Sequence, residues 1–125
     1  MKNITTIILT SFLLSCGSAD NGIITSIENE LKVTKGKSIN LVNATNFKWD
    51  RVCIIGPYYS QELQDKTFGF KTQLLATGND GVSTLAFIKS DNVLTYINHP
   101  RNKGDFLNIL NNKKCYEYNE IINLK

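Results

Sequence analysis

The sequence predicts one small α+β domain, with a sheet of about five antiparallel or mixed strands and two or three short helices packed on one face. Three observations support this class. The chain has 125 residues, of which 42% are hydrophobic and 20% charged, as expected for a single domain. Strand-like and helix-like segments alternate along it without a repeat. No stretch of the sequence reaches the roughly 20 apolar residues of a membrane span.

The N-terminal residues have the order of a signal peptide. Lys2 supplies the positive charge, and an apolar run from Ile4 to Leu14 follows it. Residues 13–16, LLSC, resemble the lipobox of bacterial lipoproteins. This resemblance implies cleavage directly before Cys16 and lipidation of its sulfur. The alternative is a buried N-terminal helix with a chance cysteine.

The expected organisation is a lipoprotein signal peptide over residues 1–15, a lipidated cysteine and tether over 16–30, and a folded domain over 31–125. Two or three acyl chains hold a protein firmly at a bilayer, so the membrane is an expected partner through Cys16. In Gram-negative bacteria an Asp directly after the lipidated cysteine often retains a lipoprotein at the inner membrane. Gly17 occupies that position. The expected location is therefore the bacterial cell envelope, at the periplasmic face of the outer membrane if the host is Gram-negative.

Cys53 and Cys115 remain after Cys16 is assigned to the lipid. An even pair in an oxidising compartment predicts a disulfide. The bond would close a loop of about 60 residues, for which the chain-entropy model gives roughly 4 kcal/mol. It would join the predicted central and final strands, with Tyr116 and Tyr118 facing away from it. A redox or metal pair is the alternative, but the chain has no C-x-x-C and one histidine.

The first half of the folded region contains two predicted strands. Residues 23–31 fit either a short helix or a loose lead-in. Residues 38–42 alternate polar and apolar side chains, as a half-buried strand does. Residues 51–55 form a β-branched run that stops at Gly56-Pro57, which is typical of a central strand buried on both faces.

A short helix is expected to follow the central strand. Ser60 is suited to cap its N-terminus, and Gly69 is suited to end it after about Thr67. Leu63 and Phe68 are expected to point inward from this helix.

The second half contains the strongest local signal, a β-hairpin of residues 82–89 and 93–98 joined across Ser90-Asp91-Asn92. Residues 105–110 predict a helix capped by an aspartate, and residues 113–118 return as a strand. The side chains expected to share one face of the second hairpin strand are Val93, Thr95 and Ile97.

Residues 47–59, FKWDRVCIIGPYY, resemble an F-x-W-D-x-V-x-I-x-G-P-Y signature of short exported or lipid-anchored bacterial proteins. The similarity extends to the hairpin and to residues 98–106, NHPRNKGDF. It implies a shared fold and carries no activity with it.

Aromatic and charged residues around these motifs are the candidates for binding a partner, because Trp, Tyr and Arg are favoured in interfaces. For Trp49, packing in the core is the favoured interpretation. His99 is expected to be a loop residue between hairpin and helix, with Arg101 lowering its pKa if the two are close. The candidate residues are Trp49, Asp50, Tyr58, Tyr59, His99 and Arg101.

The expected function is that of a lipid-anchored, non-enzymatic envelope protein whose domain binds another protein, as an immunity or inhibitor protein or as an accessory to an envelope assembly. The net charge of +3 is too small for a nucleic-acid partner, and no pattern indicates a metal or cofactor. The alternatives are a small envelope enzyme using Asp50, Tyr58 or His99, or a small-ligand carrier with a pocket between helices and sheet. Convergence of the candidates in one cleft would favour an alternative.

Overall fold

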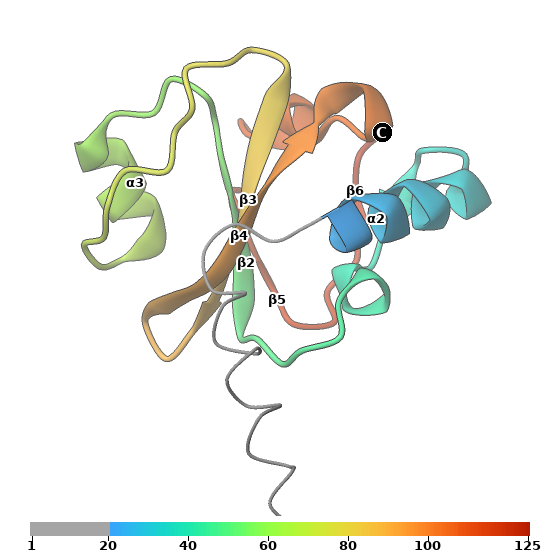
Figure 1. The fold of residues 1–125 in the computed structure, drawn as a ribbon, viewed down its shortest axis with the longest axis horizontal. Helices are drawn as coiled ribbons and strands as arrows, with labels where there is room; N and C mark the ends of the chain where they lie inside the picture. The colour runs from blue at the N-terminus through green and yellow to red at the C-terminus, as the bar shows by residue number, and fades with distance from the viewer. Residues whose placement is uncertain (1–20) are drawn as a thin grey trace, which may run out of the picture.

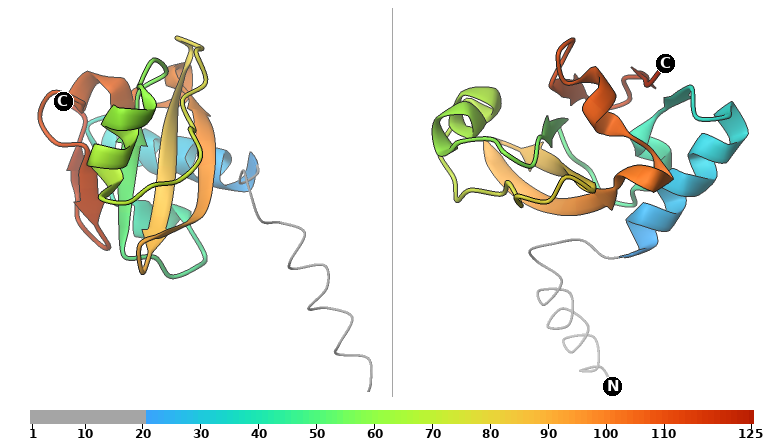
Figure 2. Two further views of the ribbon diagram at one scale, coloured as in Figure 1. Left: turned by 90° about the vertical axis from the view of Figure 1, so that its left-hand side faces the viewer. Right: turned by 90° about the horizontal axis from the view of Figure 1, so that it is seen from above.

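A four-stranded antiparallel sheet with helices on both faces forms the centre of this computed structural model, which describes residues 21–125 (Figure 1). Helix α3 lies on one face, and α2 with a two-stranded sheet lies on the other (Figure 2). The α+β class is confirmed. The expectation that the helices pack on only one face of the sheet is wrong. The elements are α2 (Asn21–Thr34), β1 (Ser38–Ile39), the 3₁₀ helix η1 (Leu41–Ala44), β2 (Arg51–Ile55), α3 (Gln61–Phe68), β3 (Val82–Lys89), β4 (Asn92–Pro100), the 3₁₀ helices η2 (Arg101–Lys103) and η3 (Phe106–Ile109), β5 (Cys115–Glu117) and β6 (Ile122–Asn123).

Strand β2 is an interior strand of the larger sheet, as its sequence predicts. The strand order is β4-β3-β2-β5, and β2 pairs antiparallel with both neighbours. Residues 52–55 are all fully buried. Alternate side chains of β2 therefore enter hydrophobic cores on opposite faces of the sheet.

We call these two clusters the α2-side core and the α3-side core. In the α2-side core, side chains from α2, η1, η3 and the C-terminal strands pack against the sheet. The α3-side core is smaller and lies beneath α3 and the segment that follows it. The α2-side core contains Ile27, Leu31, Ile39, Leu41, Ala44, Trp49, Val52, Ile54, Leu85, Phe87, Ile97, Phe106, Ile109, Tyr116, Ile122 and Leu124. The α3-side core contains Cys53, Ile55, Phe68, Leu75, Ala86 and Ile88.

Helix α2 begins at residue 21, within the region expected to be a tether. Ile27 and Leu31, one helical turn apart, are buried in the α2-side core. The folded part therefore extends further towards the N-terminus than residue 31. The predicted signal peptide and Cys16 lie outside the described residues.

The predicted hairpin is confirmed as β3 and β4. Its two-residue loop, Ser90-Asp91, has positive φ at both positions, which matches the twist of paired strands. A β-bulge is the one departure. Ile88 pairs with Val93 and Phe87 with Thr95, so Leu94 is an extra residue. The bulge places Val93 against the α3-side core and Ile97 in the α2-side core, so the expectation that they share one face is wrong.

The predicted limits of α3 are confirmed. The Ser60 hydroxyl accepts a hydrogen bond from the Leu63 N–H, and Gly69 ends the helix in the left-handed conformation. Phe68 points inward, but Leu63 is 38% exposed. Gln64, one turn before Phe68, is buried instead, because its side-chain amide bonds the backbone of residues 73 and 75.

Two expected elements are replaced by tighter turns. The strand expected over residues 38–42 is only β1, after which the chain forms η1, capped by the Asn40 side chain. The helix expected over residues 105–110 is η3, a 3₁₀ helix that Asp105 caps. In both cases the predicted apolar side chains are buried, since one 3₁₀ turn suffices to bring Leu41 or Phe106 into the α2-side core.

The predicted disulfide joins Cys53 of β2 to Cys115 of β5. These residues are direct register partners, and their Cα atoms are 4.0 Å apart. Tyr116 and Tyr118 face the α2-side core, opposite the bond, as alternation predicts. Because β5 has only three residues, the covalent bond holds an edge strand that has few backbone hydrogen bonds of its own.

Replacing both cysteines, Cys53→Ala with Cys115→Ala, is expected to lower the free energy of unfolding by about 4 kcal/mol, because the unfolded chain regains the entropy of a long loop. Thermal and urea unfolding would measure the change. As a control, a reductant should destabilise the native chain and leave the double variant unaffected. Equal stability of the two oxidised proteins would contradict a stabilising role for the bond.

Candidate partner-binding surface

The sheet topology separates the candidate residues into two groups. Trp49 and Asp50 precede β2, whereas Tyr58 and Tyr59 follow it, so these pairs lie at opposite ends of the strand. Strand β4 runs in the same direction as β2, since both are antiparallel to β3. Arg101, which follows β4, therefore lies at the same end as Tyr58.

Asp80, just before β3, connects Tyr58 and Arg101. Tyr58 is 69% exposed. The neighbouring Asp80 carboxylate raises the pKa of the Tyr58 hydroxyl, mainly as its hydrogen-bond partner. The Arg101 Nη1 donates a hydrogen bond to the backbone oxygen of Asp80 at 3.1 Å. Tyr58 and Arg101, two of the candidate residues, thus both interact with Asp80.

The guanidinium of Arg101 is held in place from two sides. Its Nε and Nη2 donate to the two carboxylate oxygens of Asp105 at 2.9 and 2.7 Å, a bidentate geometry that is strong and directional. The hydrogen bond to Asp105 raises the pKa of Arg101. Asp105 also accepts the Leu107 N–H at the start of η3. The cation is therefore preorganised at the surface.

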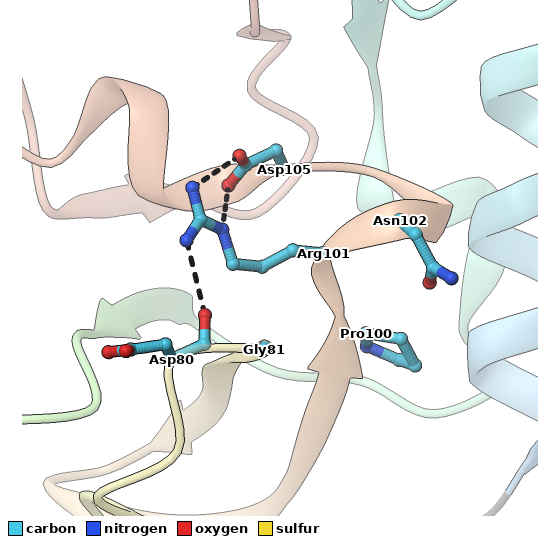
Figure 3. Close-up of a pocket in the computed structure, with 6 residues that line it drawn as sticks. All are labelled: Asp80, Gly81, Pro100, Arg101, Asn102 and Asp105. Carbon is cyan, nitrogen blue, oxygen red and sulfur yellow. Dashed lines mark hydrogen bonds and ion pairs between the residues drawn. The ribbon is translucent and has the colours of Figure 1, made fainter.

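These side chains surround an open hollow of about 620 Å³, which we call the Arg101 hollow (Figure 3). Its walls come from the turn before β3, the end of β4 and the loop before η3. Small-molecule sites are mostly apolar and enclose their ligand. The lining residues here are Asp80, Gly81, Pro100, Arg101, Asn102 and Asp105. Such an open surface with charged side chains suits a side chain presented by a macromolecule.

Tyr59 is half-buried and packs on the α3-side core. Its ring covers Gly56, where an added Cβ would lie 3.0 Å from the Tyr59 Cε1. Burial raises the pKa of its hydroxyl. Tyr59 therefore fixes the turn after β2 and presents little surface to a partner.

Trp49 and Asp50 have structural positions at the other end of the sheet. Trp49 is 4% exposed, packs against Phe87 and Tyr118, and donates its indole N–H to the Thr45 hydroxyl, so its expected place in the core is confirmed. The Asp50 carboxylate accepts the Ser90 N–H at 2.8 Å. It thereby secures the hairpin turn.

His99 is fully buried within β4, so the expectation of a loop residue is wrong. Its Nε2 lies 3.1 Å from the Lys103 backbone oxygen, and because that oxygen can only accept, Nε2 carries the proton. Nδ1 is buried without a hydrogen-bond partner, as is the hydroxyl of Ser83 directly opposite. Burial, rather than Arg101, is the main cause that lowers the pKa of His99.

The candidates do not form a catalytic constellation. His99 is buried, Tyr58 is exposed beyond β2, and Asp50 lies at the opposite end of that strand. Within residues 21–125, no group of three or more His, Cys, Asp or Glu side chains is arranged to hold a metal ion. In the same part of the chain, no helix has the length and apolar character needed to cross a membrane.

Sequence reasoning missed two members of the surface, Asp80 and Asp105. Asp105 was expected only as a helix cap, although its spacing of four residues from Arg101 is a signal for an ion pair. Asp80 belongs to a turn-like run of residues 77–81. Only the return of the chain to the same end of the sheet places it beside Tyr58.

Comparison of the chain with family models, curated proteins and solved structures finds no match. Its function must therefore be argued from its own residues.

Lowering the pH from about 7.5 to about 5.5 is expected to destabilise the fold through His99. The histidine of the unfolded chain titrates near 6.5, and the folded pKa lies below this value. The unfolded state therefore binds more protons as the pH falls below about 6.5. The free energy of unfolding then decreases, by at most about 1.4 kcal/mol per pH unit, until the pH falls below the folded pKa.

Urea unfolding at both pH values would measure this change. The control is His99→Gln, which is expected to be less stable at both pH values but to show a smaller pH dependence. Glu28 and Lys103, whose charges act on His99, are present in both proteins. An equal pH dependence in the two proteins would assign the effect to other groups.

Proposed function

We propose that the protein is a lipid-anchored component of the bacterial cell envelope whose folded domain binds another protein. The observation that carries this proposal is the Arg101 hollow, with exposed Tyr58 beside it and Arg101 held by Asp80 and Asp105. Tyrosine and arginine are enriched among the residues that dominate protein interfaces. A rigid arginine loses little conformational entropy when a partner binds.

The two alternatives have less support in the geometry. An enzyme built on Asp50, Tyr58 and His99 would need those side chains to converge, and they lie apart. A small-ligand carrier would need an enclosed apolar pocket between helix and sheet, but the Arg101 hollow is open, contains charged side chains and lies at the end of the sheet. An immunity or inhibitor role, or an accessory role in an envelope assembly, is consistent with a small rigid binding domain.

The lipid anchor is supported by the LLSC tetrapeptide and by the start of the fold. Helix α2 begins at residue 21, so only four residues would separate a lipidated Cys16 from the domain. The five steps of an extended chain from residue 16 to residue 21 span at most roughly 18 Å. The domain would therefore remain near the membrane surface, which for a Gram-negative host is the periplasmic face of the outer membrane.

Photo-crosslinking would test the binding proposal in cells. The full chain with p-benzoylphenylalanine at Tyr58 is expected to form an adduct of defined mass with a protein partner. The same probe at Val33, an 81% exposed position on α2, should not form it. Adding Arg101→Ala should reduce the adduct at Tyr58 roughly tenfold or more, because an anchoring side chain is lost. Equal adduct formation at Val33, or insensitivity to Arg101→Ala, would contradict the proposed surface.

The substitution Cys16→Ser is expected to leave the precursor unlipidated and mostly uncleaved, because the thiol is the acyl acceptor. Metabolic labelling with a fatty acid and membrane fractionation would measure both effects. Cys53→Ala with Cys115→Ala is the control, since it removes the other two cysteines and should leave the lipid in place. Normal cleavage and membrane retention of Cys16→Ser would disprove the lipoprotein assignment.

A further inference from the structure

The two arginines of the chain have different surroundings. The guanidinium carbon of Arg51 lies 6.0 Å from the centre of the Phe70 ring, so the fold itself supplies an aromatic contact to this cation. The side chain of Arg101 is 37% exposed. Within residues 21–125, no aromatic ring lies over Arg101. The cations that have such a contact are those of Lys48, Arg51 and Lys113.

The hydrogen bonds of Arg101 occupy the edge of its guanidinium. Nε and Nη2 donate to Asp105, and Nη1 donates to the backbone oxygen of Asp80. Since the N–H groups of a guanidinium lie in its plane, these bonds fix the plane without covering its faces. Figure 3 shows the three bonds leaving from the edge, and no other labelled side chain lies over the guanidinium in that view. The group therefore presents a fixed, flat cation to the hollow.

We propose that the protein partner places an aromatic side chain in the Arg101 hollow, where its ring stacks on the guanidinium of Arg101. This inference rests on the proposed function and specifies the class of residue that the partner presents. The face of an aromatic ring carries partial negative charge and attracts a cation, and tryptophan does so most strongly. A guanidinium also stacks on such a ring, because both groups are planar.

The charges of the hollow favour a neutral ring over a charged side chain. Both carboxylate oxygens of Asp105 already accept hydrogen bonds from Arg101. The carboxylate of Asp80 points away from the guanidinium in Figure 3 and is a hydrogen-bond partner of Tyr58. A cation would be repelled by Arg101, and an anion by the two aspartates. A ring avoids both repulsions, and an indole N–H can also donate to an acidic side chain of the wall.

A second copy of this chain fits the hollow less well. Within residues 21–125, the exposed large aromatic side chain is Tyr58, which lies beside the same hollow through Asp80. If two copies exchanged these tyrosines, the hollows would face each other. Asp80 and Asp105 of one copy would then approach the same residues of the other, and like charges oppose association. A ring from another protein brings no such charge.

Nuclear magnetic resonance of the lipidated full chain in detergent micelles would test the proposal. The probe is N-acetyltryptophanamide, a neutral indole. The two arginine Nε–H signals report on the two guanidinium groups separately. A stacked indole should shift the Arg101 signal in a saturable manner at millimolar concentrations of the probe, by its ring current. The Arg51 signal is the internal control, and it should stay in place because Phe70 already contacts that cation.

Competition would identify the chemical class that the hollow accepts. The competitors are the N-acetyl amides of lysine, glutamate and leucine, each added in roughly tenfold excess over the tryptophan probe. We expect none of them to reverse the shift of Arg101, since none presents an aromatic face.

Two variants with the same change in charge locate the contact. Arg101→Gln removes the planar cation and should weaken probe binding at least roughly fourfold, measured on the backbone amides of Gly81 and Asn102 in the wall of the hollow. Lys103→Gln removes a neighbouring exposed charge and should leave the affinity within about 1.5-fold. An intact Cys53–Cys115 bond and a cooperative unfolding transition would show that Arg101→Gln is folded.

Four results would overturn the aromatic contact: no shift at Arg101, equal shifts at both arginines, equal affinity of the two glutamine variants, or displacement of the probe by the lysine, glutamate or leucine competitor. Concentration-dependent self-association that Arg101→Gln abolishes would assign the hollow to a second copy and also overturn it. If the adduct at Tyr58 persists and still depends on Arg101, the proposed binding function stands with another class of anchor. Loss of that adduct as well would remove both proposals.

Discussion

The complete burial of β2 on both faces is the constraint on which the rest of the structure depends. A strand with apolar side chains on both sides must be covered twice, so this small chain forms two cores rather than one. Helix α2, η1, η3 and the C-terminal strands cover one face, and α3 with the segment after it covers the other. The edges of β2 also require partners, and β3 and the disulfide-linked β5 satisfy its backbone.

The elements that the sequence predicted well are those with local chemical signals. Ser60 and Gly69 bound α3, and the polar turn at residues 90–92 identifies the hairpin. The predictions were wrong where packing between distant segments, rather than local sequence, determines the structure. Helix α2 is stabilised by burying Ile27 and Leu31 in the α2-side core. The bulge at Leu94 reverses side-chain alternation within one strand, and the hydrophobic pattern alone carries no sign of it.

At the candidate surface, too, the sequence identifies residues by their type, whereas the fold determines which of them lie together. Tyr58 and Arg101 stand out in the sequence by residue type, but their proximity follows from the antiparallel order of β2, β3 and β4. Asp80 becomes important only because the chain re-enters the sheet beside them. His99, next to the surface in sequence, is instead an inward-facing residue of β4. The turn before β3, the end of β4 and the loop before η3 thus form the hollow, and Tyr58, after β2, lies beside it.

The disulfide also determines how the chain would respond to proteolysis. Cys53 and Cys115 close a covalent ring that includes α3, β3, β4 and the irregular residues 70–81 between α3 and β3. Exposed segments without regular structure are the preferred sites of proteolytic cleavage. One cut in this segment would open the backbone, yet both fragments would stay joined through sulfur. Only a second cut within the ring would free a piece of the sheet, so a singly nicked molecule would keep all its strands.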